Sequence, residues 1–143
     1  YGEEQVKIWR RSFDISPPKL KKNDIRHPKN NSKFKNLECE HPTGESLKNV
    51  ISRLLPFLNN YFDFISNNEG DHMIVAHSNS LRAMVKTLEG LSDTEIIEVN
   101  IPTGVPLVYK LNNELNIIDK KYLIDEETLK RKKEIVENQG KIQ

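Results

Sequence analysis

The sequence has little of what a membrane-spanning, secreted or metal-binding protein contains. Cys39 is the single cysteine among 143 residues, so no internal disulfide bond can form, and this suits a reducing compartment. No run of about 18 apolar residues predicts a transmembrane helix, and the first residues lack the basic and apolar regions of a signal peptide. The four histidines show no tight ligand spacing, which argues against a metal site. We therefore expect a cytoplasmic protein that uses no metal.

The chain also has almost no net charge. Its 22 lysines and arginines balance 21 aspartates and glutamates, which leaves +1 at pH 7. Such a chain has no bulk attraction for nucleic acid or for an acidic membrane, so we expect neither partner. Hydrophobic residues make up 36% of the sequence, less than in an average globular chain, so much of it should be loop or solvated helix. The length suits one domain.

Apolar periodicity predicts two helices in the first half of the chain. Residues 2–13 and 44–65 carry apolar side chains at helical spacing. Thr43 or Ser46 could cap the second of these helices, and Pro56 should kink it. Residues 15–43 between them hold four prolines and few large apolar residues, so we expect a long loop. Either a functional lid or a surface insertion fits this loop.

Strands and helices should alternate in the second half. The patterns predict a doubly buried strand at 73–76, a helix at 81–88 that stops at Gly90, a capping box at 92–95, a strand at 105–111 and a helix from Asp125 to Gly140. This is an α/β arrangement. Two strands are fewer than a stable sheet usually has, so the chain looks like part of a domain.

The segment His77–Ser80 is the strongest candidate for a binding site. It follows the predicted strand 73–76 and opens the next helix, and ligands of α/β sheets bind beyond the carboxyl ends of strands. A helix N-terminus favours anions, a protonated His77 would add charge, and Asn79 or Ser80 could donate hydrogen bonds. These features predict a phosphate or carboxylate site, although a structural histidine is the alternative. The absence of a Gly-x-Ser-x-Gly motif argues against a serine hydrolase.

Arg10 and Arg11 are the second candidate. Guanidinium groups bind phosphate and carboxylate through two parallel hydrogen bonds. Adjacent residues of a helix point about 100° apart, so the two arginines need not share a target. Two surface arginines, one of them paired with a neighbouring glutamate, are the alternative.

Several stretches of the chain carry a combined resemblance to one family. They are Tyr1–Asp14, Ala76–Arg82 with the sequence AHSNSLR, Leu88–Asp93 with Asn100–Tyr109, and Gln139–Lys141. Together they resemble the cofactor-dependent phosphoglycerate mutases of the histidine phosphatase superfamily, in which the second stretch reads AHGNSLR. The resemblance covers nearly the whole chain and is weakest between Pro18 and Pro42.

The resemblance implies a fold, a reaction and a set of site residues. The fold would be a three-layer structure with a mostly parallel sheet flanked by helices. The reaction would interconvert 3-phosphoglycerate and 2-phosphoglycerate in glycolysis through a phosphohistidine that 2,3-bisphosphoglycerate primes, without a metal. His77 would be the second active-site histidine, Arg10 and Arg11 would bind the anionic groups of the substrate, and Ser78 and Asn79 would lie near the phosphate. Family members form dimers and tetramers, so a homo-oligomer is expected.

The sequence departs from the family in two places. The Arg-His-Gly-Glu motif with the nucleophilic histidine does not occur here. Residues 1–143 therefore resemble the C-terminal portion of one mutase domain without its N-terminal strands, with a long loop at 15–43 and a C-terminal helix and tail at 120–143. We expect this chain alone to be inactive. Ser78 replaces the family glycine, and a positive φ there would strain the backbone.

Two other functions fit the same residues. One is a related bisphosphoglycerate mutase or phosphatase, because the same site serves those activities. The other is a non-catalytic phosphate-binding or interaction module.

Overall fold

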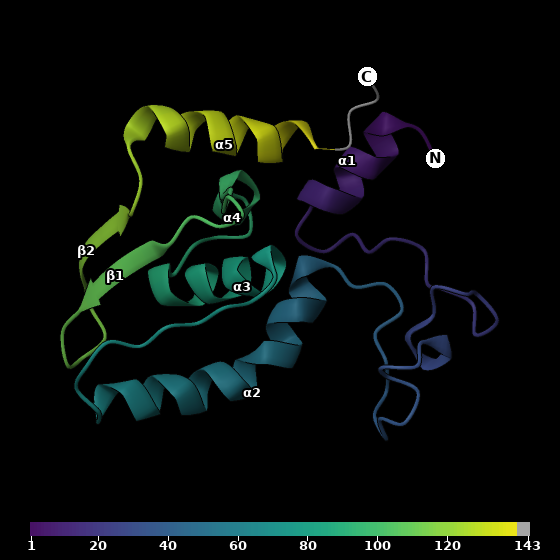
Figure 1. Cartoon of the computed structure of the whole chain (residues 1–143), viewed down its shortest axis with the longest axis horizontal. Helices are drawn as coiled ribbons and strands as arrows, with labels where there is room; N and C mark the ends of the chain where they lie inside the picture. Colours follow the sequence, from purple (N-terminus) through teal and green to yellow (C-terminus); the bar gives the residue numbers. More distant parts are fainter. Residues whose placement is uncertain (140–143) are drawn as a thin grey trace.

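The computed structural model describes residues 1–139 and has the α/β composition that the sequence predicts. The elements, in chain order, are α1 (Glu3–Arg11), the 3-10 turn η1 (Pro28–Asn30), α2 (Leu47–Ser66), α3 (Ser78–Glu89), α4 (Glu95–Glu98), β1 (Leu107–Leu111), β2 (Ile117–Tyr122) and α5 (Glu126–Asn138) (Figure 1). Asp125 caps the C-terminal helix, as predicted, and the helix runs to Asn138; Gly140, the predicted stop, lies outside the described residues. Residues 120–122, which were assigned to the C-terminal helix and tail, belong to β2.

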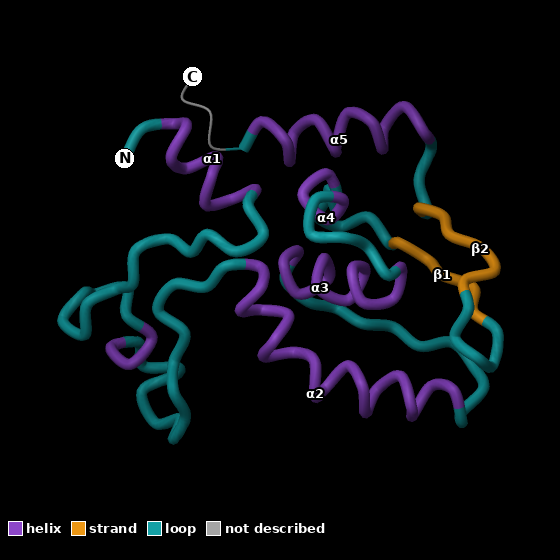
Figure 2. The backbone as a smooth tube through the Cα atoms, turned by 180° about the vertical axis from the view of Figure 1, so that it is seen from behind, coloured by secondary structure: helices purple, strands orange, loops and turns teal. Residues whose placement is uncertain are grey.

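Helix α3 lies at the centre of the packed part of the molecule. It packs along α2, and both backbone views place it between α2 and α4 (Figures 1 and 2). Leu58 of α2, Ala83 of α3 and Ile96 of α4 are completely buried. Burial of a side chain the size of leucine stabilises a fold by about 1.5–3 kcal/mol. These few side chains therefore fix the position of α3, whose first residues form part of the site described below.

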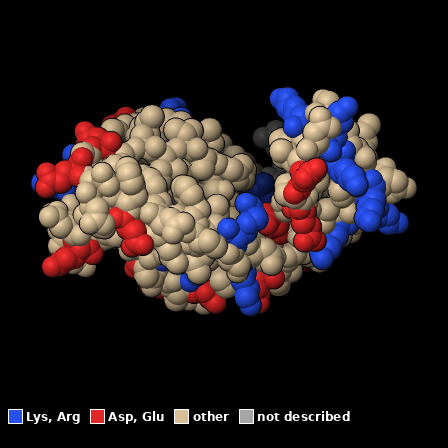
Figure 3. Space-filling view, turned by 90° about the horizontal axis from the view of Figure 1, so that it is seen from below, with Lys and Arg blue, Asp and Glu red and all other residues tan. Residues whose placement is uncertain are grey.

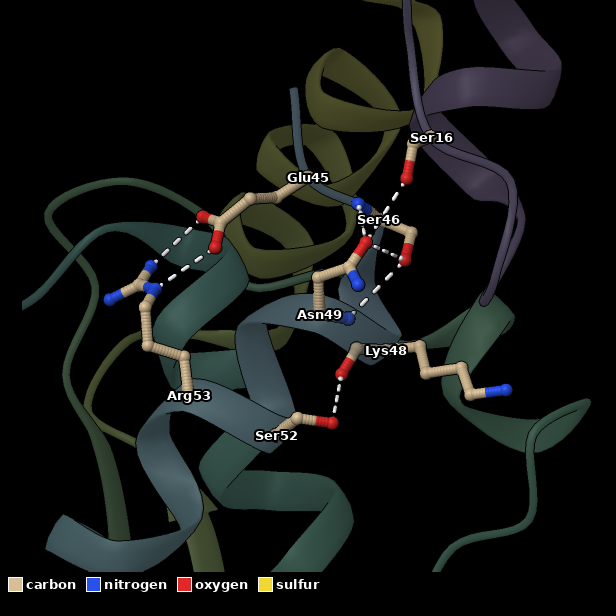
Figure 4. Close-up of polar contacts among 7 residues, drawn as sticks. All are labelled: Ser16, Glu45, Ser46, Lys48, Asn49, Ser52 and Arg53. Carbon is tan, nitrogen blue, oxygen red and sulfur yellow. Dashed lines mark hydrogen bonds and ion pairs between the residues drawn. The ribbon is translucent and has the colours of Figure 1, made fainter. Parts of the chain in front are cut away.

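Helix α2 begins with the cap that the sequence offered. The hydroxyl of buried Ser46 accepts a hydrogen bond from the backbone N–H of Asn49 at 3.3 Å, and Asn49 Oδ1 accepts one from the backbone N–H of Ser46 at 3.0 Å (Figure 4). Ser16 donates to the same Oδ1 at 3.1 Å, which ties the preceding loop to this helix end. Pro56 lies within α2, whose axis changes direction part-way along (Figures 1 and 2), as expected where a proline removes a backbone hydrogen bond.

The predicted strand at 73–76 does not form. Its residues are extended but pair with no strand of the described chain, and Figure 1 shows the segment running between α2 and α3. Met73 and Val75 are 87% and 85% exposed, so the prediction of burial on both faces was wrong. A continuous apolar run indicates a buried strand only where neighbouring strands and covering helices are present.

The sheet of the described residues is a two-stranded antiparallel hairpin, and the expected parallel sheet is absent from them. β1 confirms the strand predicted at 105–111. β2 was not predicted, because its sequence IIDKKY does not alternate between apolar and polar residues. Tyr109 of β1 donates a hydrogen bond to Glu89 of α3, and Lys120 of β2 binds the same carboxylate at 2.6 Å. Burial, followed by the Glu89 carboxylate, raises the pKa of Tyr109 and keeps its hydroxyl protonated.

Residues 15–43 form the predicted long loop, in which η1 is the only helical turn. The backbone N–H of Leu20 donates to the carbonyl of Thr43 at 3.0 Å and closes the base of the loop. A side chain at Gly44 would lie 2.9 Å from the carbonyl oxygen of Pro17, so this approach requires glycine. The loop projects from the helical body and carries many of the lysines and arginines visible in Figure 3.

Candidate active site

One cavity of ≈ 470 Å³ brings together the five site residues that the resemblance implies. It lies where the end of α1, the beginning of α3 and the end of α5 meet, and Figures 1 and 2 both show α1 beside the end of α5. The predicted residues that line it are Arg10, Arg11, His77, Ser78 and Asn79. The two arginines therefore do face one space, although they are adjacent on a helix.

His77 is the N-cap of α3. Its Nδ1 accepts a hydrogen bond from the backbone N–H of Asn79 at 3.3 Å. With Nδ1 engaged as an acceptor, Nε2 is the ring nitrogen that can donate a hydrogen bond to a ligand in the cavity. The first backbone N–H groups of α3 add the partial positive charge of a helix N-terminus.

Ser78 and Asn79 form the first turn of α3. Ser78 is not among the described residues with positive φ, so the strain expected for a serine in place of the family glycine is absent. A helical backbone accepts serine at this position. Asn79 Oδ1 accepts a hydrogen bond from Nη1 of Arg82 at 3.4 Å. With its oxygen engaged in this way, Asn79 has its amide N–H groups left for a ligand.

Neutral groups hold the two arginines of α1. Nη2 of Arg10 donates to Oε1 of Gln139 at 2.9 Å. Nη1 of Arg11 donates to Oδ1 of Asn100 at 2.5 Å, and its Nη2 donates to the carbonyl of Val136 at 3.4 Å. No carboxylate of the described residues pairs with either arginine, so the alternative of a surface ion pair with glutamate was wrong. Both guanidinium groups are oriented, and no carboxylate of residues 1–139 compensates their charge.

Four further polar side chains line the cavity, and sequence reasoning gave none of them a role: Arg82, Asn100, Gln139 and Glu45, which is described below. Arg82 follows Asn79 by three residues on α3, so helical spacing alone could have placed it on the same face. Burial, and after it the charge of Arg11, lowers the pKa of Arg82. Asn100 and Gln139 come from distant segments. Each begins a stretch that carries the family resemblance, but the sequence analysis gave neither residue a place in the site. The hydroxyl of Tyr122 donates to the carbonyl of Asn100 at 3.4 Å and fixes the residue that holds Arg11.

The cavity is electrically positive. Glu45 is the one carboxylate among the described residues that line it, and it forms a two-bond ion pair with Arg53 at 2.9 and 3.0 Å (Figure 4). Its charge is therefore already neutralised. Three arginines, a histidine N–H and a helix N-terminus remain, a set that suits a ligand with several negative charges.

Residues 1–139 contain neither a membrane-spanning helix nor a cluster of metal ligands. No helix there has the length and apolar composition needed to cross a bilayer. No three histidine, cysteine, aspartate or glutamate side chains of this part of the chain converge as metal ligands would. Cys39 is free and exposed, with its Sγ 3.9 Å from Nδ1 of His41.

Comparison with known proteins identifies the family of the chain. The sequence model of the histidine phosphatase superfamily (branch 1) matches residues 18–118. Proteins named 2,3-bisphosphoglycerate-dependent phosphoglycerate mutase from Hydrogenobaculum sp. (strain Y04AAS1) and Treponema denticola are each 49% identical to 99% of this chain, and the one from Borreliella afzelii is 45% identical over the same share. The chain spans 58% of the length of each of these curated relatives. By sequence, the chain belongs to the histidine phosphatase superfamily, branch 1.

Proposed function

We propose that the complete protein interconverts 3-phosphoglycerate and 2-phosphoglycerate in glycolysis, as an isomerase that 2,3-bisphosphoglycerate primes. The observation that carries the proposal is the cavity in which Arg10, Arg11 and Arg82 have no carboxylate partner among the described residues. The names of the relatives at 45–49% identity point to the same reaction. We also propose a cytoplasmic homo-oligomer as the form of the complete protein.

Each residue of the site has a role in this proposal. Arg10 and Arg11 bind the carboxylate and phosphate of the substrate, and the same groups hold the priming bisphosphate. His77 donates its Nε2–H to an oxygen of the transferring phosphoryl group, and Asn79 adds its amide N–H. Phosphoryl transfer spreads negative charge over three oxygens, so positioned donors and cations lower its barrier.

These 143 residues supply, in our proposal, the C-terminal portion of the mutase domain. Mutase chemistry through a phosphoenzyme also needs a nucleophilic histidine, which the Arg-His-Gly-Glu motif carries in the family and this chain does not contain. The chain alone should bind phosphoglycerate without transferring its phosphate. The same cavity also suits bisphosphoglycerate mutase or phosphatase activity, and rates of all three reactions in the complete protein separate these functions.

Two experiments test the proposal. The chain is first incubated with 2,3-bisphosphoglycerate and examined by ³¹P NMR, and we expect no phosphohistidine. A stable phosphohistidine on the chain would overturn its assignment as inactive. In the complete protein, His77→Ala and Arg10→Ala should each lower turnover roughly 100-fold or more, because each removes a group that stabilises transition-state charge. Wild-type rates in either variant would contradict the assigned roles.

A further inference from the structure

Arg82 is a buried cation with no counter-ion among residues 1–139. Its side chain is 7% exposed and lines the cavity. Nη2 donates to the backbone carbonyl of Ile96 at 2.6 Å, Nη1 donates to Asn79 at 3.4 Å, and Nε has no hydrogen-bond partner among the described residues. A buried charge is costly unless an opposite charge lies beside it.

Three other lysine or arginine side chains illustrate a structural role, because each is paired with a carboxylate. Lys86 lies one turn further along α3 and also holds a backbone carbonyl, that of Leu91 at 2.5 Å. It has a counter-ion, because Asp93 lies 2.9 Å away. Arg26 and Arg53, which lie outside the cavity, pair with Asp24 and Glu45 in the same way. Holding the carbonyl of Ile96 therefore does not explain why Arg82 is charged and unpaired.

The contact between Arg82 and Asn79 gives this charge a function. The Asn79 side chain could turn either its oxygen or its NH₂ group toward the cavity. A guanidinium N–H can pair only with the oxygen, so Arg82 selects the orientation that leaves the NH₂ group for a ligand. An oxygen facing the cavity would repel an anion. Arg82 thus converts a neutral amide into a donor for anions and adds its own charge behind it.

We infer that Arg82 is a positioning residue of the anion site, which acts through the amide of Asn79 and whose missing counter-ion is the phosphate of the bound ligand. The inference rests on the proposed function and extends it by one residue. Anion binding should then be linked to Arg82, whereas a purely structural arginine would affect only folding.

The test is NMR of the ¹⁵N-labelled chain with inorganic phosphate as the probe. In the unmodified chain, phosphate should shift the Asn79 side-chain NH₂ signals and the Arg82 Nε–H signal, but not the Nε–H signal of Arg26. Arg82→Gln should weaken phosphate binding at least tenfold and move the Asn79 NH₂ signals before any phosphate is added. Arg82→Lys keeps the charge and should restore part of the affinity but not the Asn79 signal positions.

Lys86→Gln is the matched control, because it removes a partly buried cation and a bond to a carbonyl from the same helix. It should lower the melting temperature and leave phosphate affinity unchanged. A folded Arg82→Gln variant with unchanged affinity and unchanged Asn79 signals would overturn the inference. If Arg82→Gln does not fold, the unmodified chain still provides a test. The inference is overturned if phosphate does not shift the Arg82 Nε–H signal of that chain. Phosphate shifts at His77 and Arg11 without shifts at Arg82 would refute only the inference, whereas no shift at any of these residues would also refute the proposed site.

Discussion

At the scale of single residues, the site depends on what holds each arginine. Arg11 reaches two acceptors on different segments, Oδ1 of Asn100 and the carbonyl of Val136, with its two terminal nitrogens. Only a planar guanidinium can do this and still direct charge into the cavity. The acceptors are neutral, so a bound anion meets a cation whose charge is not already shared.

Arg11→Lys should therefore weaken binding of 3-phosphoglycerate although the charge is kept. The donors of lysine all sit on one nitrogen and cannot reproduce the planar two-nitrogen fork that reaches Asn100 and Val136, so we expect a loss of about tenfold, or ~1.4 kcal/mol. Isothermal titration calorimetry on the chain measures this loss. Arg131→Lys, the same exchange on the exposed face of α5, is the control and should leave the affinity unchanged. Equal affinities of Arg11→Lys and the original chain would contradict the role of Arg11.

Ser78→Gly tests the departure from the family. Ser78 sits without strain in the first turn of α3, so removing its side chain should leave phosphate affinity the same or raise it by opening the cavity. Glycine is less favourable in a helix, and the free energy of unfolding should fall by about 0.5–1 kcal/mol. A large loss of affinity would show that the Ser78 hydroxyl itself binds the anion.

The sequence predicted His77, Asn79 and the pair Arg10 and Arg11 as site residues, because each lies in a short motif. It left out Asn100 and Gln139, which lie 89 and 129 residues away from the arginines they hold. Contacts of this kind follow from how α1, α4 and α5 pack, and no local pattern encodes that packing. Arg82 is different, since its helical spacing from Asn79 could have revealed it.

At the scale of elements, local signals predicted the helices better than the strands. Helix α2 has its own cap, proline and apolar face, so its limits follow from nearby residues. The segment 73–76 needs strands from elsewhere, and its apolar residues remain exposed where no such strand lies beside it. β2 is exposed at all but its last residue and pairs because a turn brings it back onto β1. Whether a segment forms a strand thus depends on the strands beside it, which the periodicity of its own sequence does not reveal.

The cap of α2 can be tested by Ser46→Ala. The exchange removes the hydroxyl that accepts the N–H of Asn49, so thermal or urea unfolding should show a loss of about 1 kcal/mol. Ser52→Ala is the control on the same helix, because that exposed hydroxyl donates only to the carbonyl of Lys48 (Figure 4). It should be neutral or slightly stabilising, as alanine favours a helix interior. Equal losses in both variants would contradict the cap.

At the scale of the whole molecule, an extended apolar segment and a compact anion site follow each other directly. Met73 and Val75 are almost fully exposed just before His77. An extended segment with free backbone groups and apolar side chains is a template for pairing with another strand. The segment that precedes the site is therefore suited to pairing with another strand.

We expect the purified chain to self-associate through this segment. Sedimentation velocity over a hundredfold range of protein concentration should show a rising weight-average mass. Val75→Lys places a charge in the segment and should shift the association to higher concentration. Lys110→Arg, on an exposed position of β1, is the control and should not. A chain that stays monomeric throughout the range would contradict this expectation.

The central claim is that this chain carries the second histidine and the arginine pair of a phosphoglycerate site. The most direct test is an NMR titration of the labelled chain with 3-phosphoglycerate, with glycerate, which lacks the phosphate, as the matched ligand. We predict saturable shifts at the backbone N–H groups of His77–Asn79 and at the Nε–H groups of Arg10 and Arg11, with glycerate binding at least tenfold more weakly. Shifts confined to the lysines of the 15–43 loop, or equal affinities for the two ligands, would contradict it.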